Sequence, residues 1–179
     1  VVGPEQPLAE GIVDLFEEQG LKIFGPTKRA AQLEWSKAFA KDFMQRHGIP
    51  TARYQTFTVV ERTKAVRYLH ATSYPVVLKA DGLAAGKGVV ICNDRESALV
   101  SLRQMMDEKV FGESNDTVVI EEFMTGQEAS VFAICDGTNY VTLAPAQDHK
   151  RVLDDDQGKN TGGMGAYAPA PIVTPELLK

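Results

Sequence analysis

The amino-acid sequence predicts an α+β protein that begins with the remnant of an α/β parallel-sheet domain. Residues 1–26 alternate extended and helical patterns, as a strand–helix–strand unit of a parallel sheet does. After Pro50 short apolar strands alternate with two helical patterns, which is typical of an α+β lobe. From residue 119 onward strands follow one another with only turns between them, which indicates a second, antiparallel piece.

The first segment, residues 1–26, is expected to form one β–α–β unit. The stretch "VVGPE" resembles the end of a strand, and "LKIFG" resembles a short second strand. The helix between them should end at Gly20. Its apolar stripe consists of Leu8, Ile12, Leu15 and Phe16.

Residues 27–53 link this unit to the next one through a single long helix. The helical pattern runs from Thr27 to Gly48 and stops before Pro50. The face expected to be buried consists of Ala31, Trp35, Ala38, Phe39 and Phe43. Lys37 and Lys41 lie off that face.

Two further segments, 54–118 and 119–179, complete the predicted organisation. The first contains the strands "RYQTF", "PVVLKA" and "GVVIC" and the helices "ERTKAVRYLHA" and "DRESALVSLRQMMDE". The second contains the strands "TVVIEEFM", "EASVFAIC" and "YVTLAPA", separated by Thr-Gly and Asp-Gly turns. From Gln147 to Pro171 the sequence has charge and glycine but no periodicity, so we expect a long loop there that is either functional or disordered.

Composition predicts a globular protein with small-molecule partners. Of its 179 residues, 44% are hydrophobic, which is enough for a core. The net charge of −5 argues against nucleic acid as a partner, because affinity for phosphate backbones needs a cationic face, and no apolar run is long enough to suggest a membrane partner. Cys92 and Cys135 have no C-x-x-C partner, which favours a cytoplasmic location.

Both ends of the chain lie within expected secondary-structure elements. The chain opens on "VVGPE" without Met and ends on "TPELLK", which resembles the first turn of a helix, so we expect a fragment cut at both ends. Nothing in the sequence indicates the oligomeric state, and a monomer is compatible with it.

The stretch "KADGLAAGKGVV" is a glycine-rich loop between two strands, expected to form a hairpin. It is not a P-loop, because only three residues separate Gly82 from Gly86 and Gly88 stands where the magnesium-binding hydroxyl would be. The glycines let backbone N–H groups approach an anion, and Lys79 and Lys87 add positive charge, which favours a polyphosphate. The alternative is a hairpin tip with exposed lysines, but a lysine that ends an apolar strand normally needs a partner or a function.

The stretch "VIEEFMTGQEAS" suits an adenosine. An extended backbone at Phe123 and Met124 offers C=O and N–H groups in turn to an adenine edge, while a carboxylate such as that of Glu128 accepts both ribose hydroxyls. Glu121 and Glu122 end the preceding strand. The alternative is an exposed strand end with solvated glutamates.

The stretch "QDHKRVLDDDQGKNTGGMG" has the residue types of a grip on a substrate phosphate. Its cationic, hydrogen-bonding and small residues are His149, Lys150 and Arg151, then Asn160 and Thr161, and then Gly162, Gly163 and Gly165. No second histidine or cysteine lies at ligand spacing from His149, and the three adjacent carboxylates at 154–156 point in different directions, so no metal site is assigned.

In chain order these features are a helix lysine, a strand lysine, a glycine loop, a Glu-Glu-aromatic segment and a carboxylate seven residues past Glu121. This order resembles the ATP-grasp superfamily. Within that superfamily, "SKAFAKDFM", "GIPTA", "GLAAGKGV", "QDHKR" and "NTGGMGAY" resemble the glycinamide ribonucleotide synthetase family over essentially the whole chain. The resemblance implies two α+β lobes that enclose ATP: a small lid subdomain at 54–118 and the first part of a large subdomain at 119–179, after the N-terminal remnant and the linking segment.

The resemblance also implies roles for residues at matching positions. Those expected to bind ATP are Lys37, Lys79, Gly86, Lys87, Gly88, Glu121, Glu122, Phe123, Met124, Glu128 and Asn160. Of these, Lys79 and Lys87 are expected to be catalytic. Glu121 (mainly through its backbone), Phe123 and Met124 are expected at the adenine, Glu128 at the ribose and Asn160 at the phosphate end. Those expected on the amine-substrate side are Pro145, Asp148, Lys150, Arg151, Gly162 and Gly163. The glycine loop is expected to close over the phosphates as a lid.

The reaction implied by the resemblance joins glycine to 5-phosphoribosylamine in purine biosynthesis. ATP would convert glycine to glycyl phosphate, which the amine attacks to give glycinamide ribonucleotide, ADP and phosphate. The family's magnesium (or manganese) ligands are expected beyond Lys179 and its first strand before Val1, so the 179-residue chain alone is expected to be inactive. The alternatives are another ATP-grasp carboxylate–amine ligase or carboxylase of nucleotide metabolism, or a non-catalytic ATP-binding module.

Overall fold

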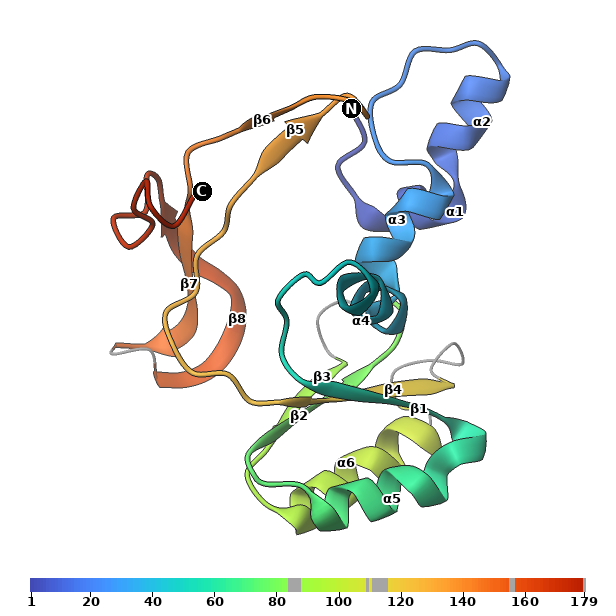
Figure 1. Ribbon diagram of the computed structural model, residues 1–179, viewed down its shortest axis with the longest axis vertical. Coiled ribbons are helices and arrows are strands. Elements are labelled where there is room, and N and C mark those ends of the chain that lie inside the picture. Colours follow the sequence, from blue (N-terminus) through green and yellow to red (C-terminus); the bar gives the residue numbers. More distant parts are fainter. Residues whose placement is uncertain (84–87, 109, 111–115, 155–156, 179) are drawn as a thin grey trace. The chain divides into compact units, whose positions relative to one another are not determined.

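An antiparallel sheet of four strands organises the N-terminal part of the computed structural model (Figure 1). The structure describes residues 1–83, 88–108, 110, 116–154 and 157–178. These residues form two compact units, Val1–Met124 and Thr125–Lys179, and each unit is described by itself. The predicted boundaries at 26, 53 and 118 stay predictions.

The strands of the first unit pair in the order β1-β4-β2-β3, and each pair is antiparallel. Their bounds are β1 (Tyr54–Thr58), β2 (Val76–Ala80), β3 (Val89–Cys92) and β4 (Thr117–Glu122). Because β2 and β3 are antiparallel neighbours, the glycine-rich stretch between them joins a hairpin, as predicted. Residues 84–87 of that stretch, which include Gly86 and Lys87, lie outside the described residues.

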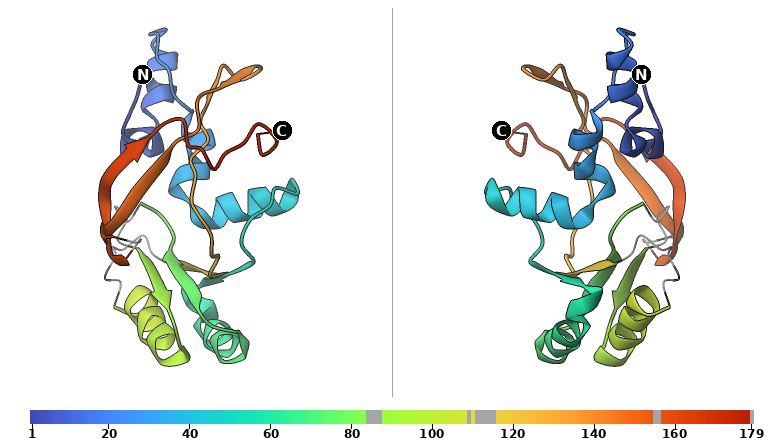
Figure 2. Two further views of the ribbon diagram at one scale, coloured as in Figure 1. Left: turned by 90° about the vertical axis from the view of Figure 1, so that its left-hand side faces the viewer. Right: turned by 90° about the vertical axis from the view of Figure 1, so that its right-hand side faces the viewer.

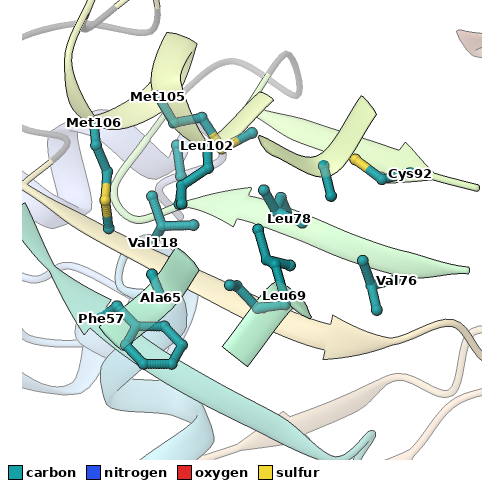
Figure 3. Close-up of a cluster of buried hydrophobic side chains, with 13 residues drawn as sticks. Phe57, Ala65, Leu69, Val76, Leu78, Cys92, Leu102, Met105, Met106 and Val118 are labelled. Carbon is teal, nitrogen blue, oxygen red and sulfur yellow. The ribbon is translucent and has the colours of Figure 1, made fainter. Parts of the chain in front are cut away.

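One face of this sheet is covered by α5 (Arg62–Ala71) and α6 (Arg95–Met106), with the 3₁₀ turn η1 (Val59–Glu61) before α5. Figure 2 shows both helices side by side on the same side of the sheet. Alternate strand residues point toward them, because side chains in a strand alternate between its two faces. The apolar side chains that meet there include Phe57, Ala65, Leu69, Val76, Leu78, Cys92, Leu102, Met105, Met106, Val118 and Ile120 (Figure 3).

The helix predicted at the N-terminus is broken at Gly11. The two pieces are α1 (Glu5–Glu10) and α2 (Ile12–Glu18), and Gly11 adopts φ 95°, a left-handed conformation that favours glycine. The break changes which residues face inward: Val13 is 1% exposed, whereas Leu15, expected on the buried stripe, is 55% exposed. The expected single apolar stripe is therefore wrong.

The two segments on either side of these helices were expected to be strands. Neither of them forms a strand among the described residues. Residues 1–4 and 21–24 are joined by one backbone hydrogen bond, from Val2 N to Phe24 O at 3.0 Å. A ladder needs several successive bonds, and a pair of extended segments without further neighbours is only marginally stable.

The single long helix expected after Thr27 is two helices, α3 (Lys28–Trp35) and α4 (Lys37–Arg46). Ser36 lies between them in an extended conformation, φ −116° and ψ 106°, and its Oγ accepts a hydrogen bond from Phe39 N at 3.2 Å. Serine is favoured at such a position because its hydroxyl satisfies an otherwise free N–H of the first turn. The long apolar face is therefore wrong: Ala31 is buried in α3, but the residue buried in α4 is Lys41.

The second unit contains two hairpins. The first pairs β5 (Ala133–Cys135) with β6 (Tyr140–Thr142), and the second pairs β7 (Gln147–Leu153) with β8 (Gln157–Tyr167). A structureless loop was expected where β7 and β8 lie. The sequence lacks apolar alternation there because most of the described side chains of these strands are exposed, so backbone pairing rather than a buried face defines them.

We expect Leu78→Ala to lower the free energy of unfolding of the chain by about 2–5 kcal/mol, because Leu78 is fully buried on a central strand and its removal leaves a cavity in the core. Urea unfolding measures the change. Val60→Ala is the control, since Val60 is 92% exposed and its truncation should change the free energy by less than about 0.5 kcal/mol. Equal effects of the two substitutions would contradict the assignment of the core.

Candidate functional site

The face of the sheet opposite α5 and α6 carries two charged side chains at its centre. Lys79 pairs with Val119 across β2 and β4, and Glu121 pairs with Val77, so the two charged residues are diagonal neighbours on one face. Lys79 Nζ donates to Glu121 Oε2 at 2.9 Å. The side chain of Glu121 is only 5% exposed, and that of Lys79 is 28% exposed.

Helix α4 lies on this side of the sheet and contributes a second lysine to the same carboxylate (Figure 1). Lys41 Nζ lies 3.3 Å from Glu121 Oε2 and also donates to Thr51 Oγ1 at 2.7 Å and to the Ala52 carbonyl at 3.4 Å. Glu121 Oε1 is buried and has no hydrogen-bond partner within the described part of the chain. We call Lys41, Glu121 and Lys79 the charged cluster.

The expectation that Lys41 lies off the buried face is wrong. The helix break at Ser36 is the physical reason, because it starts a new helix whose residues no longer continue the face of α3. The side chain of Lys41 is 9% exposed, and a lysine this buried normally has a counter-ion, which here is Glu121.

The start of α4 is attached to the start of the glycine-rich stretch. Asp81 Oδ2 accepts from Ser36 Oγ and Asp81 Oδ1 accepts from Ala38 N, both at 3.1 Å. Lys37 Nζ donates to the Gly82 carbonyl at 2.9 Å. Burial lowers the pKa of Lys37; the charge of Asp81 opposes this shift and that of Lys79 adds to it. The two lysines therefore influence each other electrostatically.

The segment after β4 begins with a carboxylate that is already paired. Glu122 Oε1 accepts from Arg53 N at 2.9 Å, and Glu122 Oε2 accepts from Arg53 Nε at 2.7 Å, so these bonds lower the pKa of the Glu122 carboxyl. Phe123 is 36% exposed and Met124 is 66% exposed. A hollow of about 490 Å³ lies beside Glu122 and Phe123.

The second unit brings together three of the predicted polar residues. Lys150 Nζ lies 3.3 Å from Glu128 Oε2 and 3.6 Å from Asp148 Oδ2. The bond to Glu128 is the main cause of a raised pKa of Lys150. Thr161 Oγ1 donates to the Lys150 carbonyl at 2.9 Å and accepts from Gly163 N at 3.1 Å, which connects the two strands of the hairpin by a side chain.

For the remaining predicted residues of this unit, the structure describes the backbone and its contacts. The Pro145 carbonyl accepts from Ala170 N at 2.8 Å. Arg151 and Asn160 pair across β7 and β8, but their side chains lie outside what the structure describes. A Cβ built on Gly162 would meet no atom within 4 Å.

The predicted site residues thus form two groups. Lys37, Lys79 and Glu121 are close together in the first unit, with Glu122, Phe123 and Met124 at the end of the same strand and Gly88 just before β3. Glu128, Asp148 and Lys150 are close together in the second unit. The roles predicted for both groups stay predictions.

Four residues that contact the first group were not predicted from the sequence: Ser36, Lys41, Arg53 and Asp81. The signal that could have revealed Ser36 is "WSK", in which a serine precedes a lysine, since serine commonly begins a helix. Nothing comparable precedes Arg53, whose pairing with Glu122 depends on two strands far apart in sequence.

Within the described residues, no group of three or more His, Cys, Asp or Glu side chains could hold a metal ion. No helix in the described part of the chain is long and apolar enough to cross a membrane.

Family comparison covers both units. Residues 35–179 match the model of the phosphoribosylglycinamide synthetase ATP-grasp (A) domain, and residues 1–34 match that of the phosphoribosylglycinamide synthetase N domain. The phosphoribosylamine–glycine ligase of Chlorobaculum tepidum is 57% identical over 179 residues, which are all of this chain and 42% of that protein. The chain thus spans less than half the length of this relative.

Solved structures agree with the sequence matches. The crystal structure of the Thermotoga maritima phosphoribosylamine–glycine ligase is 41% identical with a TM-score of 0.73, over 82% of this chain and 37% of that one. The biotin carboxylase domain of Hydrogenobacter thermophilus 2-oxoglutarate carboxylase, solved with MgADP, ADP and bicarbonate, is 26% identical with a TM-score of 0.68, over 91% of this chain and 35% of that one.

These matches confirm the predicted α+β ATP-grasp fold. The family model covers most of the chain, and it covers the charged cluster, the strand that ends in Glu122 and both hairpins of the second unit. The chain therefore belongs to the phosphoribosylglycinamide synthetase family, with residues 35–179 in its ATP-grasp domain.

Proposed function

We propose that the complete gene product is a phosphoribosylamine–glycine ligase of purine biosynthesis. It would join glycine to 5-phosphoribosylamine at the expense of ATP, giving glycinamide ribonucleotide, ADP and phosphate through a glycyl phosphate intermediate. The observation that carries this proposal is the 57% identity to a phosphoribosylamine–glycine ligase over every residue of the chain. The ligand types are nucleotide, amino acid and sugar phosphate, so no nucleic acid or membrane is required, and we propose a cytoplasmic location.

The charged cluster and Lys37 fit the phosphates of ATP. Lys79 is the member of the cluster that is partly exposed, and Lys37 is near enough to influence it. Two ammonium groups that face one side of a sheet can neutralise a polyphosphate without a helix N-terminus. The glycine-rich stretch starts beside them at Gly82, and we propose that Gly86, Lys87 and Gly88 cover the phosphates from there.

The end of β4 fits the adenosine. Glu121 Oε1 is buried without a hydrogen-bond donor in the described part of the chain, which is unusual for a carboxylate oxygen and suits a site that a ligand completes. Beyond it, Phe123 and Met124 offer partly exposed apolar surface. We propose that Glu121, Glu122 and these two residues contact the adenine, while Glu128 and Asn160 contact the ribose and phosphate end.

The work of these residues in the reaction is electrostatic. The transferred phosphoryl group carries charge on its equatorial oxygens, and Lys79 and Lys87 would stabilise that charge as it develops. Magnesium, when bound, would neutralise the same oxygens as a Lewis acid, but no described group of carboxylates fits it, so no ligand is assigned here. No nucleophilic side chain is needed.

The β7–β8 hairpin fits the amine substrate. Lys150 forms ion pairs with Glu128 and Asp148, so this hairpin carries a positive charge beside two carboxylates. The Pro145 carbonyl uses one lone pair on Ala170 N and keeps the second available. We propose that these residues, with Asp148, Arg151, Gly162 and Gly163, line the phosphoribosylamine and glycine side.

The proposal is tested by phosphate release from ATP with the complete gene product and 5-phosphoribosylamine. We expect release only when glycine is present. Bicarbonate and alanine should not replace glycine, because a carboxylase or another carboxylate–amine ligase of the same fold would use such acids instead. Equal release with either acid would reject the ligase proposal, and ATP binding without release under any condition would favour a non-catalytic ATP-binding module.

We expect Lys79→Met to lower kcat/KM for ATP by about ten- to hundredfold, the effect of losing one hydrogen bond between charged groups. The fold should survive, because Lys41 still compensates the buried Glu121 carboxylate. Steady-state kinetics and a thermal unfolding curve measure the two effects. Lys64→Met is the matched control: Lys64 forms a 2.8 Å ion pair with Glu61 but is 67% exposed. If Lys79→Met behaves like the control, Lys79 is not in the site.

A further inference from the structure

We propose that Lys41 is a positioning residue that keeps Glu121 compensated while Lys79 moves from this carboxylate to the phosphates of a nucleotide. Lys41 itself would not touch the nucleotide. The inference rests on the proposed function in one respect, which is that Lys79 binds a phosphate.

Both lysines contact the same oxygen of the Glu121 carboxylate. Glu121 Oε2 lies 2.9 Å from Lys79 Nζ and 3.3 Å from Lys41 Nζ, while Oε1 has no hydrogen-bond partner in the described part of the chain. The carboxylate is only 5% exposed, so water solvates it poorly. Within the described residues, Lys41 and Lys79 are the two cations that lie within ion-pair distance of this carboxylate.

The two lysines differ in how firmly they are held. Lys41 has two further acceptors, Thr51 Oγ1 at 2.7 Å and the Ala52 carbonyl at 3.4 Å, and its side chain is 9% exposed. Lys79 has Glu121 as its one hydrogen-bond partner in the described part of the chain, and its side chain is 28% exposed. If one of them changes partner, it is Lys79.

The free-energy cost of moving Lys79 away from Glu121 depends on whether another lysine remains beside the carboxylate. A lysine that leaves a buried carboxylate with no other counter-ion strands an uncompensated charge in a poorly solvated place. With Lys41 present, the buried charge keeps an ion pair after Lys79 has left. Without Lys41, Lys79 must stay on Glu121, and a phosphate loses its contact with Lys79. Lys41 thus acts on nucleotide affinity through the other two members of the cluster.

The test compares equilibrium binding of ATP and adenosine, measured by calorimetry with the complete gene product. We expect Lys41→Met to weaken ATP binding about ten- to hundredfold, the effect of one lost hydrogen bond between charged groups, and not by more than Lys79→Met does. Adenosine affinity should stay within about twofold, because adenosine has no phosphate to draw Lys79 away.

A purely structural role of Lys41 predicts something different. In that case Lys41→Met would weaken ATP and adenosine alike, or neither of them, and either result overturns the inference. Lys64→Met again serves as the control and should leave both affinities unchanged. If Lys79→Met also leaves ATP affinity unchanged, the proposed phosphate role of Lys79 fails, whereas a loss in Lys79→Met alone rejects only the role of Lys41.

A second pair of variants covers the case in which Lys41→Met does not fold. The double variant Lys41→Met/Glu121→Gln has no buried charge at position 121 and is compared with Glu121→Gln alone. The two should bind ATP equally, because Lys79 has no carboxylate to compensate in either variant. Thermal unfolding curves measure separately how much Glu121→Gln is destabilised by leaving Lys41 without its counter-ion. Weaker ATP binding by the double variant would contradict the inference.

Discussion

The ion pairing of one buried carboxylate is the constraint on which the site of this chain depends. Glu121 lies one residue before the end of a central strand and is almost fully buried, and one of its oxygens is shared between Lys79 of the sheet and Lys41 of α4. A charged group in such a position is tolerated only when it is paired, so the strand, the neighbouring strand and the helix must all be in place for the region to be stable. The same pairing delivers two cations to the face of the sheet that is not covered by α5 and α6, where a phosphate would be received.

The second requirement is the break in the helical segment at Ser36. Because Ser36 ends α3 and begins α4, the residues after it start a new helix that turns Lys41 toward Glu121 and Lys37 toward the glycine-rich stretch. Asp81 fixes this arrangement by accepting bonds from Ser36 and Ala38.

Much of the fold was predictable because it follows local patterns. The strands and helices of the small lobe show clear alternation or helical spacing, and the hairpin around the glycine-rich stretch is present as expected. The contacts of Lys79 with Glu121 and of Lys150 with Glu128 could not be derived, because they join residues far apart in sequence. The burial of Lys41 was missed for a related reason, since a lysine on a helix is normally exposed and only its tertiary counter-ion explains it. The β7–β8 hairpin was missed because its described residues are mostly exposed, so they leave no hydrophobic period to detect.

The central claim is that the charged cluster receives the phosphates of ATP by a change of partner at Lys79. A crystal structure of the complete gene product with a non-hydrolysable ATP analogue measures this directly. The account predicts that Lys79 Nζ lies within hydrogen-bond distance of a phosphate oxygen, while Lys41 Nζ stays within ion-pair distance of Glu121. A nucleotide bound elsewhere, or a Lys79 that remains on Glu121 with the phosphates held by other residues, would contradict it.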